Sequence, residues 1–207
     1  MENNNTSDNR YYSDGIIKDV LQKGCKRNSD ISKEVLRSLV ILAVELSREG
    51  REGRKIGTMF VVGDQRKVLK SSRTLILDPL KGHTAEEKKF TDADLRETVK
   101  ELSQLDGAFV VANDGTFLSA TRYIFTDIKN INVPLGLGSR HIAAASITRS
   151  TNSVAIVVSE SSVVRIFING KVVSEIIPEL WLIQKARRKG IGAGNDLVRE
   201  NITPTTS

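Results

Sequence analysis

The tripeptide Asp106-Gly107-Ala108 is the first place in the chain where residue types suggest chemistry, because it lies between a predicted helix and a predicted buried strand. An aspartate at the start of a strand could hold a divalent metal or polarise a hydroxyl that attacks a phosphate. Gly107 and Ala108 leave the backbone uncovered, so a bulky ligand could approach closely. Taken alone, the three residues fit an ordinary turn before a strand better than they fit a catalytic site.

The second candidate is the glycine-rich segment 136–141, which enters a predicted helix. Ser139 could cap that helix, and the free N–H groups of a first helical turn, here following Gly138, make an anion site. Arg140 adds a fork that suits phosphate oxygens, and His141, one of two histidines in the chain, adds a donor or a metal ligand. The spacing matches neither a P-loop nor a dinucleotide fingerprint. An ordinary helix start with a solvated arginine is an equal alternative.

Three further features were weighed as sites. Ser159 and Glu160 lie in a polar segment between two predicted strands, where small hydroxyls could hold phosphates, although a plain polar turn is the stronger interpretation. His83 is predicted to lie in a surface loop, and Cys25 in a basic, mobile segment without chemistry. The chain has no histidine pair with zinc spacing and no Gly-x-Ser-x-Gly elbow.

Hydrophobic periodicity predicts the helices that must position these residues. Ser29 or Asp30 could cap the first helix, and Gly50 could end it. Thr91 with Asp94 resembles a capping box for the second. The predicted helices span residues 31–49, 91–105 and 140–149.

Short apolar runs predict the strands. The run 57–63 lacks alternation, which indicates burial on both faces. Tight-turn signals at Asn113-Asp114-Gly115 and Asn169-Gly170 predict two hairpins. The predicted strands cover residues 57–63, 74–77, 108–112, 116–120, 154–158, 163–168 and 171–176.

The pattern therefore predicts an α/β fold with a mixed central β-sheet flanked by helices. We expect a flexible leader over residues 1–30, one domain over 31–178 and a basic C-terminal segment over 179–207.

Composition narrows the class of protein. The 207 residues are 39% hydrophobic and 27% charged, which is typical of a folded chain. No apolar stretch approaches the roughly 18 to 20 residues of a membrane span, and residues 1–14 lack the apolar segment of a secretory signal. One cysteine cannot form an internal disulfide, so we expect a cytoplasmic protein. The net charge of +6 favours anionic partners, although a solvated surface explains it equally well.

Taken together and in order, the three motifs resemble the diadenylate cyclase (DAC) domain, the N-terminal domain of bacterial DNA-integrity scanning proteins. The sequence is also similar to stand-alone archaeal diadenylate cyclases, and the resemblance covers roughly residues 57–170. One position departs from the family, because Ile142 stands where many members have a second arginine after the histidine. Arg122 and Arg149 are the candidates to replace that contact. The resemblance rests on the segments 105–111, 137–144 and 156–160.

The resemblance implies that two ATP molecules are condensed into cyclic di-AMP and two pyrophosphates, with Mn²⁺ or Mg²⁺ as cofactor. Asp106 would deprotonate the 3′-hydroxyl of one ATP, and Asp106 and His141 are the implied metal ligands. Because the product is two-fold symmetric, two subunits of a homo-oligomer would face each other. The implied catalytic residues are Asp106, Gly107, Ala108, Arg140 and His141, and the implied substrate-binding residues are Gly138, Ser139, Arg140, Leu118, Ser159 and Glu160.

Two other functions stay open at this point. The same fold could bind ATP or cyclic di-AMP as a sensor without turnover, and Ile142 leaves room for that hypothesis. A basic cluster at 185–189 beside Trp181 could bind nucleic acid, although it carries no recognised binding motif and a solvated face is the stronger interpretation.

Overall fold

The computed structural model describes residues 13–127, 136–181 and 183. In this part of the chain a seven-stranded sheet has the order β2-β4-β3-β1-β5-β6-β7, in which β1 and β3 are parallel and the other neighbours are antiparallel. The predicted mixed α/β sheet is confirmed. The elements are α1 (Ser13–Arg27), α2 (Lys33–Glu49), β1 (Thr58–Val62), α3 (Gln65–Lys70), β2 (Ser72–Thr74), α4 (Ala93–Leu102), β3 (Ala108–Val111), β4 (Phe117–Ile124), α5 (Ser139–Ser150), β5 (Val154–Val158), β6 (Val164–Ile168) and β7 (Lys171–Ile176).

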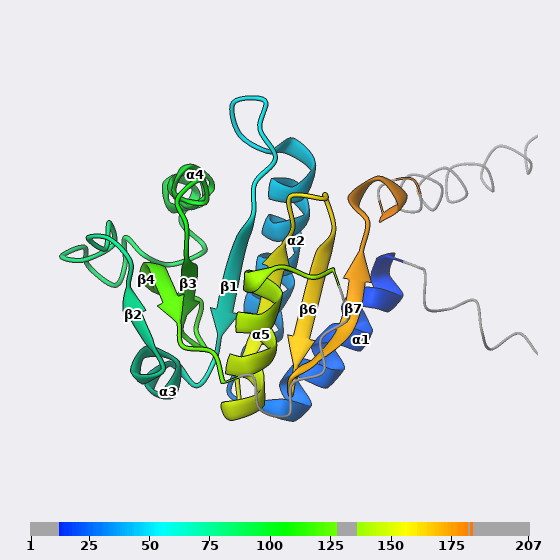
Figure 1. Ribbon diagram of the computed structural model, residues 1–207, viewed down its shortest axis with the longest axis horizontal. Coiled ribbons are helices and arrows are strands. Elements are labelled where there is room, and N and C mark those ends of the chain that lie inside the picture. The colour runs from blue at the N-terminus through cyan, green and yellow to red at the C-terminus, as the bar shows by residue number, and fades with distance from the viewer. Residues whose placement is uncertain (1–12, 128–135, 182, 184–207) are drawn as a thin grey trace, which may run out of the picture.

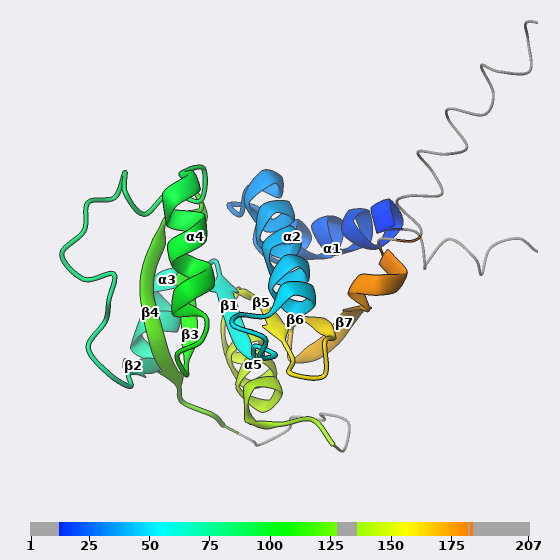
Figure 2. The same ribbon diagram turned by 90° about the horizontal axis from the view of Figure 1, so that it is seen from above.

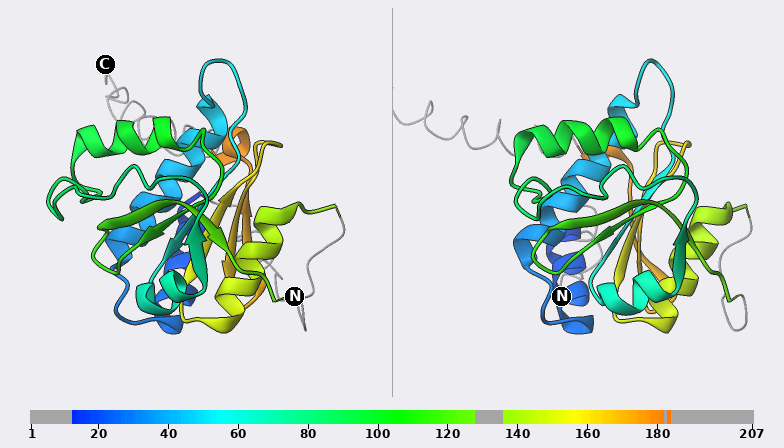
Figure 3. Two further views of the ribbon diagram at one scale, coloured as in Figure 1. Left: turned by 60° about the vertical axis from the view of Figure 1, so that its left-hand side comes forward. Right: turned by 90° about the vertical axis from the view of Figure 1, so that its left-hand side faces the viewer.

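Helices cover both faces of the sheet. Helices α1, α2 and α4 lie on one side and α5 on the other, as the view from above shows (Figure 2) and the side views repeat (Figure 3). Strand β1 is buried along its whole length, because Phe60 and Val62 pack in the cluster of α1 and α2 while Met59 and Val61 pack in that of α5. In the described residues, none of these helices has the length and apolar character needed to cross a membrane.

The predicted leader is wrong for residues 13–27, which form α1. Ile17 and Val20 are buried in the same core cluster as α2, because apolar residues recur at helical spacing in this segment. Cys25 therefore lies in a helix, not in a mobile segment, and its thiol contacts the carbonyl oxygen of Ile31 at 3.5 Å. Trp181, assigned from the sequence to the C-terminal segment, also packs in this cluster. The basic cluster 185–189 lies outside the described residues.

The predicted helix caps need correction. Ser32, not Ser29 or Asp30, caps α2, and its Oγ accepts a hydrogen bond from the N–H of Glu34. Asp92, not Thr91, caps α4 through the N–H groups of the following turn. The reason is the same in both cases: each helix begins about two residues later than predicted, and a cap must lie next to the first turn. Gly50 ends α2 as predicted.

The predicted strand over 74–77 is also misplaced, since β2 covers Ser72–Thr74. Leu77 is 94% exposed and Ile76 is half exposed, so this apolar run does not enter the core. Strand β2 is an edge strand that pairs only with β4. Its residues need not be apolar, because an edge strand is less buried than a central one. Both predicted hairpins are confirmed, as β3–β4 and β6–β7.

Gly115 offers a test of the packing between the β3–β4 turn and the α2 side of the core. Its φ is +88°, and a Cβ there would lie 2.1 Å from the ring of Phe90. Gly82 has a similar φ of +93° with nothing within 4 Å of a Cβ. We expect Gly115→Ala to lower the free energy of unfolding by about 2 to 5 kcal/mol, since backbone strain and a steric clash add. Gly82→Ala should cost about 1 to 2 kcal/mol from strain alone. Urea denaturation measures both, and equal losses would contradict the packing at Phe90.

Candidate active site

The three sequence motifs meet at one end of the central strands of the sheet. Strands β1 and β3 begin at this end and β5 ends there, because Thr58 pairs with Val158 and Met59 with Ala108. The residues just beyond these pairs therefore lie side by side, and α5 begins next to them. The loop from α2 enters β1 at this same end of the sheet (Figure 1). Parallel pairing of two strands and antiparallel pairing of the third thus brings distant parts of the sequence together.

Arg140 connects the motifs. One terminal nitrogen, Nη2, lies 2.9 Å from Oδ1 of Asp106, and the other, Nη1, lies 3.5 Å from Oε1 of Glu160. The Asp106 side chain is 77% exposed and that of Glu160 is also largely exposed, whereas Arg140 is partly covered. Nε of Arg140 is buried and has no hydrogen-bond partner among the described residues. The guanidinium therefore lies between the two carboxylates with donor capacity to spare.

Gly57 makes room for this arrangement, although no functional role was predicted for it. A Cβ at Gly57 would lie 2.5 Å from Nη1 of Arg140 and 3.0 Å from Oε1 of Glu160. A side chain here would displace both charged groups. The available signal was the glycine immediately before an apolar strand, which indicates a close approach as well as a strand boundary.

Gly107 has a different role from the one predicted. Its φ is +110°, and a Cβ would lie 2.6 Å from the backbone of Thr121, where β4 bulges against β3. The absence of a side chain therefore admits the neighbouring strand first, although Gly107 also lines a cavity. Ala108 is buried and does not line it. The N–H of Gly107 donates to Oδ1 of Asp106 at 2.9 Å, which restrains that carboxylate.

One cavity lies on the Asp106 side of Arg140 and is called here the Tyr123 cavity. Its volume is about 270 Å³. Apolar and aromatic side chains form much of its wall and charged groups its rim, a combination that suits a planar base joined to a sugar. Sequence reasoning missed most of this wall, which comes from β1, β4 and the segment after β2. The lining residues are Met59, Leu75, Asp106, Gly107, Arg122, Tyr123, Ile124, Thr126, Ser139, Arg140, Ile142 and Ala143.

A second cavity, the Ser159 cavity, lies at the start of α5 and has a volume of about 220 Å³. Gly138, not Ser139, is the N-cap, and no side chain caps this end. The predicted cap by Ser139 is therefore wrong, since Ser139 is the first helical residue. No described hydrogen bond uses the N–H of Ser139 or Arg140, so both can donate to an anion. The lining residues are Gly138, Ser139, Arg140, His141, Ser159 and Glu160.

His141 lies at the inner wall of the Ser159 cavity and is only 5% exposed. Its Nε2 is 3.3 Å from Nη1 of Arg165, which in turn pairs with Glu175. An arginine can only donate, so Nε2 accepts and Nδ1 carries the proton. Nδ1 is buried with no hydrogen-bond partner among the described residues. Burial and the charge of Arg165 lower the pKa of His141 below its ordinary value, so the ring is neutral at pH 7.

The geometry bears on the expected metal ligands. Nε2 of His141 is engaged by a guanidinium and Nδ1 carries the proton, so neither nitrogen offers a lone pair to a cation. The described residues contain no group of three metal-binding side chains. Mg²⁺ and Mn²⁺ bound with nucleotide phosphates need only one or two protein carboxylates. Asp106 and Glu160, on either side of Arg140, are the groups whose chemistry fits.

Some expected residues fall elsewhere. Leu118 is half-buried against the α5 cluster and lines neither cavity. Arg149 lies at the far end of α5, beside Gly170. Arg122 lines the Tyr123 cavity and also donates hydrogen bonds of 2.8 to 3.1 Å to Ser72 and Leu69. Of the two arginines considered as replacements at the Ile142 position, only Arg122 borders a cavity of the site.

His83 is the other histidine and stands in an exposed loop as predicted, with Nδ1 at 3.7 Å from Glu87.

The two histidines allow a matched test of the buried ring. A depressed folded-state pKa means that the unfolded chain binds a proton near pH 6.5 that the folded chain does not. Stability contributed by neutral His141 is therefore present above pH 6.5 and is lost as the pH falls below it, by up to about 1.4 kcal/mol per pH unit. We expect His141→Gln to flatten the dependence of unfolding free energy on pH between 6.5 and 5, and the control His83→Gln to leave it unchanged. Parallel curves for both variants would contradict the assignment.

Comparison with known proteins identifies the family of the chain. The family described as DAC, DisA bacterial checkpoint controller nucleotide-binding, matches residues 45–172. A protein of Methanocaldococcus jannaschii named diadenylate cyclase is 46% identical over 148 residues, which are 70% of this chain and 46% of the relative. A protein of Haloferax volcanii with the same name is 41% identical over 156 residues, or 74% of this chain and 56% of the relative. The chain thus spans about half the length of these relatives.

The fold has a counterpart among solved structures. A structure described as a hypothetical membrane spanning protein from Bacillus cereus superposes with a TM-score of 0.54 at 19% identity, over 77% of this chain and 73% of that one. This likeness supports the sheet and its flanking helices. The family match extends over more than half of the sequence and contains all three motifs that meet at Arg140. The chain therefore belongs to the DAC family, the DisA bacterial checkpoint controller nucleotide-binding family.

Proposed function

We propose that this chain is a diadenylate cyclase, which condenses two ATP molecules into cyclic di-AMP and releases two pyrophosphates. The observation that carries the proposal is the position of Arg140 between Asp106 and Glu160, with a partly apolar cavity on one side and a polar cavity on the other. Membership of the DAC family and the names of the two archaeal relatives support it.

The two cavities suggest how one ATP would lie. The base and ribose fit the Tyr123 cavity, where a planar ring can contact apolar and aromatic side chains. The phosphate attached to the ribose fits the Ser159 cavity, where the first N–H groups of α5 and the hydroxyls of Ser139 and Ser159 can donate hydrogen bonds. Arg140 lines both cavities and would meet the phosphate nearest to the ribose.

Asp106 is the proposed general base. Its exposed carboxylate would take the proton of the ribose 3′-hydroxyl, and the 3′-oxygen would then attack the α-phosphate of the second ATP. The new P–O bond forms as the bond to the β-phosphate breaks, and pyrophosphate leaves with its electron pair. The same step in the opposite sense closes the ring. A phosphate bound at Arg140 would compete with the Asp106 ion pair and so release a carboxylate oxygen for the hydroxyl.

A divalent cation is part of the proposal. Mg²⁺ or Mn²⁺ held by Asp106 or Glu160 together with phosphate oxygens would neutralise charge on the triphosphate. His141 would instead form the inner wall of the phosphate site as a neutral ring that contacts Arg165 through Nε2.

One half-site holds one nucleotide, so closing the ring requires a second subunit facing the first. Two nucleotides held in this way would react with the effective concentration of an intramolecular reaction. The cytoplasmic location expected from the sequence stays a prediction.

The alternatives are weaker on specific grounds. A sensor without turnover would not need a carboxylate beside the arginine that binds the phosphates, whereas Asp106 is largely exposed next to Arg140. The basic cluster 185–189 proposed for nucleic acid lies outside the described residues, so that hypothesis gains no support from the site.

The direct test of the activity is product formation. The purified chain incubated with ATP and Mn²⁺ or Mg²⁺ should yield cyclic di-AMP and pyrophosphate, detected by chromatography. Because two half-sites must meet, turnover per chain should rise with chain concentration until pairing saturates. Absence of product at every metal and concentration tried would end the cyclase proposal, and turnover independent of concentration down to the monomer would end the facing arrangement.

Asp106→Asn tests the base. The amide keeps the size of the side chain but cannot accept a proton, so we expect turnover to fall by about 10²- to 10⁴-fold. ATP binding measured by calorimetry without a divalent cation should not weaken, since Asp106 contacts no phosphate directly in this scheme and its ion pair competes with phosphate for Arg140. Asp94→Asn removes an exposed carboxylate of α4 that lines neither cavity, and it should leave turnover unchanged. Full activity of Asp106→Asn would show that another group is the base.

A further inference from the structure

The loop between α2 and β1 carries a basic turn next to Arg140. The N–H of Arg51 donates to the carbonyl of Arg54 at 3.0 Å, and the N–H of Arg54 donates back at 2.8 Å. Glu52 and Gly53 between them both have positive φ, as a two-residue hairpin turn requires. The turn therefore holds Arg51 and Arg54 next to each other, with Lys55 following.

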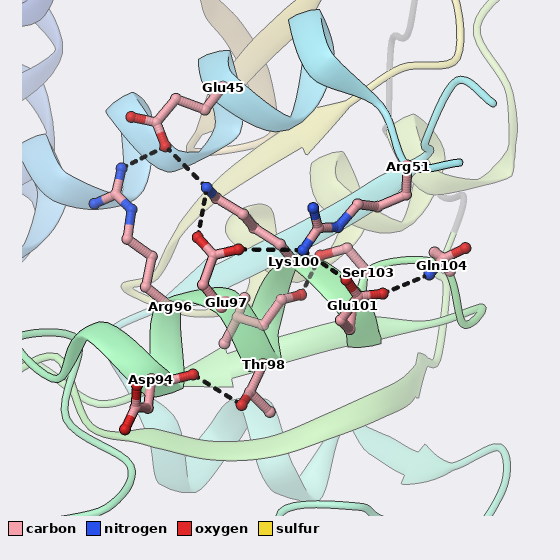
Figure 4. Close-up of polar contacts among 11 residues, drawn as sticks. Glu45, Arg51, Asp94, Arg96, Glu97, Thr98, Lys100, Glu101, Ser103 and Gln104 are labelled. Atoms are coloured by element: carbon pink, nitrogen blue, oxygen red, sulfur yellow. Dashed lines mark hydrogen bonds and ion pairs between the residues drawn. The ribbon is translucent and has the colours of Figure 1, made fainter. Parts of the chain in front are cut away.

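Helix α4 fixes the first of these arginines. Nη2 of Arg51 lies 2.6 Å from Glu101 and 3.2 Å from Glu97, and further ion pairs link Glu97 through Lys100 to Glu45 of α2 (Figure 4). Nε of Arg51 is nevertheless buried without a hydrogen-bond partner among the described residues. Arg51 is thus oriented by α4 and still keeps an unused donor.

A third cavity, called here the basic cavity, lies beside this turn and has a volume of about 170 Å³. It shares Arg140 and Glu160 with the Ser159 cavity, so the two adjoin at these side chains. Four cationic side chains line it against one carboxylate. Arg54 and Lys55 are exposed and form no ion pair within the described residues. The lining residues are Arg51, Arg54, Lys55, Ile56, Gly57, Ser103, Gln104, Arg140 and Glu160.

We propose that the basic cavity is a second anion site, which binds the terminal diphosphate of a nucleoside triphosphate and the free pyrophosphate released from it. The assignment of the nucleotide rests on the proposed function, whereas binding of pyrophosphate itself does not. If the α-phosphate lies at Arg140, the β- and γ-phosphates extend either toward Arg54 and Lys55 or toward solvent. The Ser159 cavity offers one cationic side chain against one carboxylate, which is too little for a group of several negative charges.

The residue types support a diphosphate rather than a simple solvated surface. Guanidinium groups bind phosphate oxygens through paired N–H donors, and the exposed guanidinium of Arg54 forms no ion pair within the described residues. Lys55 adds a flexible point charge at the rim. Glu97 and Glu101 form ion pairs with Arg51. The positive charges of Arg54 and Lys55 are therefore the ones available to a ligand.

The test compares two double variants of equal charge. Arg54→Ala/Lys55→Ala removes the exposed cations of the basic cavity, and Lys33→Ala/Arg37→Ala removes one exposed lysine and one exposed arginine near the start of α2, at the opposite end of that helix. Calorimetric titrations with inorganic pyrophosphate, ATP and AMP at fixed ionic strength give the affinities, and thermal unfolding verifies that both variants are folded.

We expect Arg54→Ala/Lys55→Ala to weaken pyrophosphate and ATP binding by about tenfold or more, since two charge-assisted contacts are lost. AMP has no terminal diphosphate, and its affinity should change less than about twofold. The control pair should leave all three affinities unchanged. Unaltered pyrophosphate binding, an equal loss for AMP, an equal loss in the control, or no pyrophosphate binding by the parent chain would each overturn the proposal.

The same variants separate this inference from the proposed activity. Pyrophosphate binding that depends on Arg54 and Lys55 in a chain that forms no cyclic di-AMP would retain the anion site and reject the cyclase. Cyclic di-AMP formation with an unchanged KM for ATP in Arg54→Ala/Lys55→Ala would retain the cyclase and reject the site.

Discussion

A guanidinium between two carboxylates is the constraint on which the site depends. Asp106 precedes β3, Glu160 follows β5, and Arg140 belongs to the first turn of α5, so the ion pairs fix the distance between three separate elements. The pairs are largely exposed, and such pairs add little to stability. Their importance is positional, because the same side chain borders all three cavities around it. Arg140 is therefore the side chain that the Tyr123, Ser159 and basic cavities have in common.

The sheet makes this arrangement possible, and small residues set its limits. Gly57 leaves the volume that Arg140 and Glu160 occupy, and Gly107 leaves the volume that the bulged strand β4 occupies. The bulge itself places Thr121 at a φ of +52°, which is unfavourable for a β-branched residue. Backbone strain of this kind persists when the surrounding structure holds it in place, and it clusters at functional sites. Here the bulge follows directly on the edge where Asp106 and Gly107 enter the sheet.

Sequence reasoning identified the parts of the site that have unusual chemistry and missed those that do not. Asp106, Arg140 and Ser159 stood out because their three motifs occur together and in order, although each motif taken alone fits an ordinary turn or helix start at least as well. Tyr123 and the other apolar residues of the Tyr123 cavity have many ordinary roles, so a pattern alone could not separate a wall of a cavity from a wall of the core. Leu118 illustrates the converse, since it was expected at the substrate and packs against the α5 cluster.

Element types were predicted better than their ends for a related reason. Central strands such as β1 and β5 are buried on both faces, and their uniform apolar composition is a strong signal. Helix α1 and strand β2 lie at the periphery, where tertiary contacts decide the structure of weakly patterned segments. A linear sequence could not place the turn at Arg51 and Arg54 beside Arg140, because that proximity follows from the pairing of β1 with β5.

The exposure of Asp106 has a structural meaning within the proposed reaction. A carboxylate that is 77% exposed is well solvated, and a solvated base is a weak catalyst for a step that needs a dry, ordered site. The open cavities on both sides of Arg140 likewise leave a bound triphosphate accessible to water. A second subunit facing the first would cover both, and it would bring the reacting phosphate as it does so. In this scheme the incomplete half-site limits wasteful hydrolysis, because the catalytic environment forms only when two loaded subunits meet.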